Sequence, residues 1–114
     1  MHELGIVFHV IDTIEDIAKE QELSCVKSVT LEVGEVSTVI PEYLIDCWKW
    51  AVKKTELMKE SELKYEPIEA ITFCEGCQKT YRTVDYGKTC PHCGSDNTYL
   101  VVGNEVQIKE IEAY

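Results

Sequence analysis

Two pairs of cysteines, each of the form Cys-x-x-Cys, constrain this chain more than any other feature of its sequence. Cys74 and Cys77 form the first pair, Cys90 and Cys93 form the second, and twelve residues separate the pairs. Each turn can offer two thiolates to one ion, and four sulfurs at about 2.3 Å complete a closed tetrahedral shell around Zn²⁺. The spacing therefore predicts a structural zinc site that holds a small module together.

The alternatives to zinc fit this spacing less well. Six cysteines could form three disulfides, but four of them lie in the two pairs and no export signal precedes them, which favours metal binding. Thiolates also suit iron, so a rubredoxin-like or cluster site stays open from ligand type alone. A thioredoxin-like redox site needs one pair at the start of a helix, whereas turn residues flank both pairs here.

The residues beside the cysteines are less uniform than the pairs themselves. Gly94 directly follows Cys93 and suits a tight turn that needs a positive φ. Cys77 is followed by Gln78 instead, so the first turn is less regular. His92, inside the second pair, is either a spacer or a further metal ligand, and both interpretations stay open.

The charge balance excludes several classes of partner. With 21 acidic and 11 basic side chains the net charge is -10, which repels nucleic acid and anionic membranes. Residues 71–103 hold three acidic and three basic side chains, so they have no basic surface for DNA or RNA. The first apolar run, residues 4–11, is too short to cross a membrane and lacks the basic start of a secretory signal. We therefore expect a cytoplasmic protein that binds neither nucleic acid nor membranes.

The spacing of apolar residues predicts both helices and strands. Apolar residues three and four apart predict an amphipathic helix over residues 4–23 that is buried on one face, formed by Leu4, Val7, Phe8, Ile11, Ile14 and Ala18. Alternation predicts a strand over residues 26–33, with Val29, Leu31 and Val33 on one side. Pro41 suits the first position of a second helix over residues 41–55. Residues 63–66 are typical of a short strand that ends or bulges at Pro67. After Gly103, alternation predicts a last strand that returns to the first sheet, with a bulge or end near Glu110.

A cysteine-rich module interrupts this pattern. Residues 71–103 contain the four cysteines, several turn residues and too few large aliphatic residues for a core, so a metal must hold them together. We therefore predict a discontinuous larger domain, formed by residues 1–70 and 104–114, and an inserted module formed by residues 71–103.

The amino terminus is a second candidate metal site. In Met1-His2-Glu3, the α-amine, the next amide nitrogen and Nδ1 of His2 can close adjacent chelate rings around one ion. Such a planar set of nitrogens suits Ni²⁺ or Cu²⁺, and Glu3 could add charge or a fourth ligand. A terminal histidine is more often solvated and idle, so the spacing alone leaves both interpretations open.

Four landmarks follow one another along the chain: Met1-His2-Glu3-Leu4; Val33-Gly34-Glu35-Val36-Ser37 leading to Pro41-Glu42; the cysteine pairs with Cys90-Pro91-His92-Cys93-Gly94-Ser95; and Gly103-Asn104-Glu105-Val106 with Ile111-Glu112. Together they resemble the HypA/HybF family, the nickel-insertion accessory proteins of nickel-iron hydrogenase maturation. The resemblance covers nearly the whole chain. Gln78 departs from it, because the family usually has Gly there.

The resemblance implies an α+β fold in which two helices lie on a small mixed β-sheet, the nickel-binding domain, with an inserted zinc-ribbon module. It implies transient Ni²⁺ binding by Met1, His2 and Glu3. It also implies structural Zn²⁺ binding by Cys74, Cys77, Cys90 and Cys93. A nickel metallochaperone of this kind is not an enzyme.

The resemblance further implies a nickel-handling GTPase as partner and the hydrogenase large subunit as recipient, with urease accessory proteins as further candidates. The chain lacks a GxxxxGK[ST] loop, so nucleotide hydrolysis must come from the partner. A homodimer, and the roles of Cys25 and Cys47, are left open. The main alternative function is a zinc-ribbon adaptor without nickel delivery, because it shares every feature except nickel binding.

Overall fold

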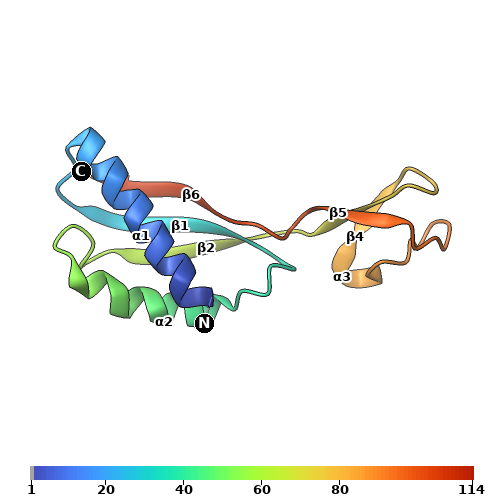
Figure 1. Cartoon of the computed structure of the whole chain (residues 1–114), viewed down its shortest axis with the longest axis horizontal. Coiled ribbons are helices and arrows are strands. Elements are labelled where there is room, and N and C mark those ends of the chain that lie inside the picture. Colours follow the sequence, from blue (N-terminus) through green and yellow to red (C-terminus); the bar gives the residue numbers. More distant parts are fainter. Residues whose placement is uncertain (1) are drawn as a thin grey trace. The chain divides into compact units, whose positions relative to one another are not determined.

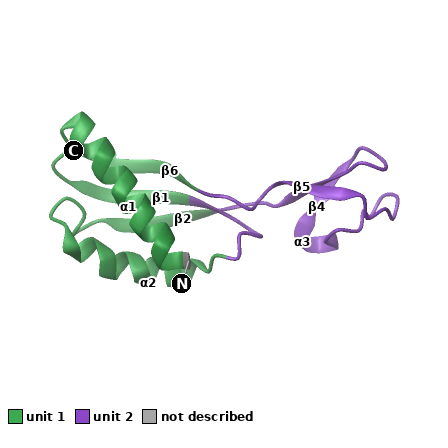
Figure 2. Ribbon diagram, in the orientation of Figure 1, with its two compact units in different colours: residues 1–31, 39–66, 107–114 green, residues 32–38, 67–106 purple. Residues whose placement is uncertain are grey.

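The computed structural model describes residues 2–114, which form two compact units. The first unit comprises the residues up to Leu31 together with residues 39–66 and 107–114. The second comprises residues 32–38 and 67–106 (Figure 2). In the described chain, no helix is long and apolar enough to span a membrane.

Two helices and a three-stranded sheet make up the first unit (Figure 1). The helices are α1 (His2–Gln21) and α2 (Pro41–Ala51), which the 3-10 helix η1 (Val52–Lys54) extends. The strands are β1 (Val26–Gly34), β2 (Glu62–Ile68) and β6 (Val106–Ala113). The predicted helices and strands are therefore present, and β6 returns to the first sheet as predicted.

The ends of both helices follow from local sequence. Helix α1 ends at Gln21 because Glu22 takes a left-handed φ of 56°, and the Leu23 N–H then donates to the carbonyl of Ala18 at 2.9 Å. Helix α2 begins at Pro41, whose fixed φ and missing N–H suit that place.

The first sheet is mixed, with the order β2-β1-β6. At opposite ends of β1, the Val26 N–H donates to Leu57 and the Glu35 N–H donates to Ile68, so β1 and β2 run in the same direction. Hydrogen bonds between Cys25 and Tyr114 and from Gly34 to Glu105 show that β6 runs opposite to β1. The α+β fold with two helices and a small mixed sheet is confirmed.

The core of the first unit is formed by one stripe of each helix and alternate residues of β1. The buried side chains include Val7, Ile11, Ile14, Val29, Leu31, Leu44 and Trp48. Trp48 is 1% exposed, and its indole N–H donates to the carbonyl of Ser61 at 3.1 Å. Phe8, which the helical spacing assigned to the buried stripe, is 39% exposed and contacts the exposed ring of Trp50 instead.

Two details of the strands differ from the expectation. Strand β2 continues through Pro67 to Ile68, which an edge strand tolerates because the missing N–H need not face a neighbour. Strand β6 also continues past Glu110, although the alternation of exposed residues slips there, at Lys109 and Glu110.

The second unit holds a smaller antiparallel sheet with the order β4-β3-β5. Its strands are β3 (Ile71–Cys74), β4 (Thr80–Arg82) and β5 (Thr98–Val102), and a single helical turn, α3 (Thr83–Tyr86), follows β4. The hydrophobic cluster of this sheet is small, with only Cys74, Tyr81 and Cys90 buried in it and Cys77 packed against them. Little apolar surface is therefore available to hold these strands together.

Gly34 and Gly103 allow three segments of the second unit, which contain Gly34, Ala70 and Gly103, to pass close to one another. A Cβ added to Gly34 would lie 2.1 Å from the carbonyl oxygen of Gly103. A Cβ on Gly103, whose φ is +115°, would lie 2.4 Å from the Cα of Ala70. Since all of these neighbours are backbone or Cβ atoms, a larger residue at either position would force the segments apart.

Candidate metal centre

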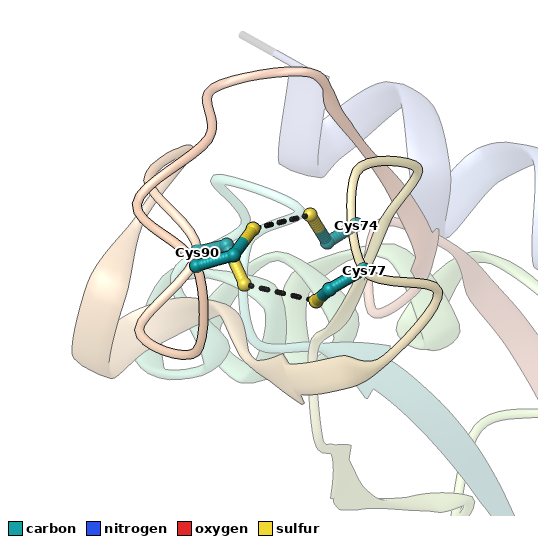
Figure 3. Close-up of side chains that lie close together, drawn as sticks. Cys74, Cys77 and Cys90 are labelled. Atoms are coloured by element: carbon teal, nitrogen blue, oxygen red, sulfur yellow. Dashed lines mark hydrogen bonds between the residues drawn. The ribbon is translucent and has the colours of Figure 1, made fainter.

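The four cysteine sulfurs converge on one point in the second unit (Figure 3). All four lie within 4.8 Å of one another. The Sγ atoms of Cys74 and Cys93 are 3.6 Å apart, and those of Cys77 and Cys90 are also 3.6 Å apart. Among the residues that the structure describes, this is the one group of three or more Cys, His, Asp or Glu side chains arranged for a metal ion.

Two similar turns position these sulfurs. Cys74 ends β3, and the Gln78 N–H donates to its carbonyl at 2.8 Å. In the second turn the Gly94 N–H donates to the carbonyl of Cys90 at 2.9 Å. Gln78 and Gly94 both take positive φ values, 60° and 75°. The first turn therefore has the same form as the second, although a side chain in this left-handed conformation costs roughly 1 kcal/mol.

The separations of the sulfurs fit a tetrahedral ion. Four zinc–sulfur bonds of about 2.3 Å at tetrahedral angles place the sulfurs about 3.8 Å apart. The paired sulfurs here are 3.6 Å apart, which is far beyond the disulfide bond length of about 2.05 Å. The cluster can therefore accept a tetrahedral metal ion with only small side-chain adjustments.

The cysteine thiols differ in how readily they lose their protons. Burial, with a hydrogen bond to Cys90, raises the pKa of Cys77 to about 12. Burial also opposes ionisation of Cys90, but the backbone N–H groups of Cys93 and His92 and the neighbouring thiols outweigh it and lower its pKa to about 6. A bound divalent cation supplies the positive charge that the remaining thiols need in order to ionise.

The site is partly shielded from water. Cys74 and Cys90 are buried, Cys77 is half-buried and Cys93 is exposed. Tyr81, from β4, packs in the same small cluster, and its hydroxyl donates to the carbonyl of Gly87 at 2.8 Å. The packing of Tyr81 against the cysteines was not predicted from the sequence. The signal was present in the alternation of Thr80, Tyr81 and Arg82, which places only the tyrosine on the inner face.

Two of the three candidate nickel residues, His2 and Glu3, are the first residues of α1. Met1 and the side chain of His2 lie outside the described part of the structure, whereas α1 begins at His2. Glu3 lies in the first turn of α1 and is 5% exposed. The sequence left open the roles of His92, Cys25 and Cys47. The side chain of His92 is exposed, and neither Cys25 nor Cys47 belongs to the cysteine cluster.

The fold and the site define a class of protein. An α+β unit accompanies a small three-stranded unit whose four cysteines form a metal-binding cluster, an arrangement consistent with a zinc ribbon. The model of the family described as "Hydrogenase/urease nickel incorporation, metallochaperone, hypA" matches residues 1–113. A hydrogenase maturation factor HypA of Chlorobium phaeobacteroides (strain BS1) is 35% identical over 111 residues, which cover 97% of this chain and 97% of that protein.

Two solved structures share the fold. The solution structure of the nickel metallochaperone HypA from Helicobacter pylori matches with a TM-score of 0.74 and 21% identity, over 97% of this chain and 96% of that one. A second HypA solution structure matches with a TM-score of 0.77 and 23% identity, over 100% of this chain and 97% of that one. This chain therefore belongs to the HypA family, whose members are nickel metallochaperones of hydrogenase maturation and not enzymes.

Proposed function

We propose that this chain binds Ni²⁺ at its amino terminus and helps to insert it into the large subunit of nickel-iron hydrogenase. The observation that carries the proposal is the family match, which extends over residues 1–113 and thus includes Met1, His2 and Glu3. The nickel ion is cargo, bound and released by the first unit. In this proposal residues 1–70 and 104–114 form the nickel-binding domain, and residues 71–103 form the zinc-ribbon domain.

The start of α1 is compatible with this use of His2. Helix α1 begins at His2, and the first four N–H groups of a helix have no acceptor within it. A metal ion can therefore take the amide nitrogen of His2 without breaking a helical hydrogen bond.

One electrostatic effect opposes the nickel site. The positive end of the helix dipole disfavours a cation at this position, by about 0.3–1 kcal/mol at an exposed site. Glu3, in the first turn, supplies a nearby negative charge that offsets the dipole. Amide deprotonation on chelation adds a second negative charge, so the site as a whole suits a divalent ion.

The cysteine cluster has a different role in this proposal. Cys74, Cys77, Cys90 and Cys93 would hold Zn²⁺ through four thiolates, which leaves no position for water or substrate. The sulfur separations support this reading because they fit a tetrahedral ion. Zinc would then be a resident structural ion that keeps the second unit folded and does not travel with the cargo.

The partners follow from the same proposal. A chain without a phosphate-binding GxxxxGK[ST] loop needs a nickel-handling GTPase to couple delivery to nucleotide hydrolysis. The acidic surface of the chain, with its net charge of -10, suits a basic patch on such a partner. With these partners the protein would work in the cytoplasm, and urease accessory proteins are alternative recipients.

Metal binding by untagged protein tests the proposal. Calorimetry and elemental analysis should find one zinc in wild type, His2→Ala and His9→Ala, and tight binding of one nickel in all but His2→Ala. His9 is the matched control because it is an exposed histidine on the same helix. An added residue before Met1 should also abolish tight nickel binding, since it displaces the α-amine. Equal nickel binding by wild type and His2→Ala would instead favour an adaptor without nickel delivery.

A further inference from the structure

A buried hydroxyl group in the first unit lacks a hydrogen-bond partner. Ser61, the residue directly before β2, is 8% exposed. Its N–H donates to the carbonyl of Met58 at 2.8 Å, and its own carbonyl accepts from the indole N–H of Trp48 at 3.1 Å. Its Oγ, by contrast, is the one buried side-chain oxygen or nitrogen without a partner among the residues that the structure describes. Buried hydroxyls are normally hydrogen-bonded, so this one indicates a place where a bound molecule completes the structure.

Ser61 also lines a cavity between α2 and the start of β2. The cavity has a volume of about 380 Å³, which lies within the usual range for small-ligand sites. The residues that line it from α2 are three and four apart and therefore share one face of the helix. The lining residues are Ile45, Trp48 and Lys49 from α2, and Ser61, Glu62 and Leu63 from the strand side. All of them belong to the first unit, so the cavity is complete within it.

The apolar walls of the cavity are held by the core. Trp48 is 1% exposed and Leu63 6%, and Ile45 is half-buried. A ligand therefore needs an apolar body that takes these surfaces out of water. The backbone of Ser61 is fixed by its two hydrogen bonds, but rotation about its Cα–Cβ bond moves Oγ between staggered positions. The hydroxyl can thus turn to meet a bound polar group.

Two side chains of opposite charge accompany the hydroxyl. Lys49 and Glu62 are exposed, and neither forms an ion pair with another residue that the structure describes. A carboxylate ligand would meet the like charge of Glu62, and an ammonium ligand would meet the like charge of Lys49. A lysine only donates hydrogen bonds, a carboxylate only accepts them, and a serine hydroxyl does both. The matching group is therefore uncharged and both donates and accepts.

We propose that this cavity binds the primary amide group of a ligand with a short aliphatic body. The amide carbonyl accepts from Lys49 and from the Ser61 hydroxyl, and the amide NH₂ donates to Glu62. The aliphatic part packs against Ile45 and Leu63. This inference goes beyond the proposed nickel function and does not depend on it.

A primary amide can reach the cavity from two sources. Free aliphatic amides carry the group, and so do glutamine side chains of a partner protein. Strand β2 is an edge of the first sheet, and Glu62 and Leu63 at its start line the cavity. An extended segment that lies along this edge can therefore place a glutamine side chain in the cavity while its backbone bonds to the strand.

Amide NMR titration of the full metal-loaded chain tests the choice of head group. Isovaleramide, isovalerate and isopentylamine share one branched aliphatic body and end in an amide, a carboxylate and an ammonium. For ligands this small we expect a dissociation constant on the order of 10 mM for isovaleramide, so the titration extends to about 100 mM at constant pH and ionic strength. Isovaleramide should shift the amides of Lys49, Ser61 and Glu62 saturably, and both charged probes should bind about fivefold more weakly or less.

Three variants assign the binding to the named groups. Ser61→Ala should bind isovaleramide about fivefold more weakly, whereas Ser24→Ala, the matched control, should bind it like the wild type. Ser24 is an exposed serine of the same unit that does not line the cavity. Glu62→Gln removes the charge that repels a carboxylate, so isovalerate should bind it more tightly than it binds the wild type. The amide spectrum shows that each variant is folded, and Glu62→Gln changes only an exposed side chain.

A glutamine capped as its N-acetyl methylamide separates the two sources. We expect it to bind more tightly than isovaleramide, because its backbone amides can bond to the edge of β2; equal or weaker binding assigns the site to free amides. Equal binding of the amide and the two charged probes overturns the proposal, as does the lack of a saturable shift up to the highest concentration. Unchanged isovaleramide binding by Ser61→Ala overturns it too, and leaves the hydroxyl to a water molecule.

Discussion

Replacing Cys90 by serine should unfold the second unit while leaving the first unit folded. Cys90 is buried in the small cluster with Cys74 and Tyr81, and its sulfur lies 3.6 Å from that of Cys77. Serine has nearly the same size but is a poor ligand for zinc at neutral pH. The change therefore removes a metal ligand with little change in packing volume.

The magnitude follows from the small core of the second unit. Burial of Tyr81, its largest buried side chain, contributes about 2–3 kcal/mol. A structural zinc ion supplies about 10–16 kcal/mol at pH 7, more than the apolar contacts of this unit provide. Loss of that ion should therefore shift the unit to a mainly unfolded state.

Amide hydrogen exchange resolves the two units separately. In Cys90→Ser, the amides of β3, β4 and β5 should lose their protection, and those of α1, α2 and β1 should keep it. Removing the metal from the wild type with a chelator should produce the same pattern. Cys47→Ser is the matched control, because Cys47 lies in α2 and outside the cysteine cluster. Persistent protection of β3 in metal-free Cys90→Ser would refute the reasoning.

Three further substitutions test the packing and the electrostatics. Gly103→Ala should destabilise the metal-loaded protein to denaturant by about 3 kcal/mol or more, because of its positive φ and its clash with Ala70. Gly5→Ala, in helix α1 with open space around it, should instead stabilise by about 0.5–1 kcal/mol. Hydrogen bonding from the Ser28 hydroxyl, together with Lys64, lowers the pKa of Glu112. Because the pKa of Glu112 is lower in the folded state, its carboxylate stabilises the fold above the pKa of about 4.3 in the unfolded state. This stabilisation is lost as the pH falls through the pKa in the folded state. Thermal unfolding of Glu112→Gln should therefore show lower stability than the wild type at pH 7 and no difference in acid.

The main elements of the fold could be predicted from the sequence because each follows a clear periodicity. Alternation in Val29, Leu31 and Val33 predicts β1, and these three residues are buried. Helix α2 starts at Pro41 as predicted, but it gives way to a 3-10 turn at Val52, before the expected end. Phe8 was assigned to the core wrongly, because helical spacing gives a face but not the width of the surface that neighbouring elements cover.

The proximity of the four cysteines could also be predicted from the sequence, because two short turns joined by a hairpin have few ways to lie apart. Gln78 was expected to make the first turn less regular, yet it takes the same left-handed conformation as Gly94. The packing role of Tyr81 and the close crossing of Gly34 with Gly103 were not predicted. Both depend on pairing between segments distant in the chain, which periodicity does not encode.

X-ray absorption on wild-type protein loaded with one zinc and one nickel tests the central claim most directly, because it reports the ligands of each ion separately. The account predicts four sulfur neighbours for zinc at about 2.3 Å. For nickel it predicts only nitrogen and oxygen neighbours, as expected for Met1, His2 and Glu3. Sulfur neighbours around nickel would contradict the account, because they would place the cargo in the cysteine cluster and not at the amino terminus.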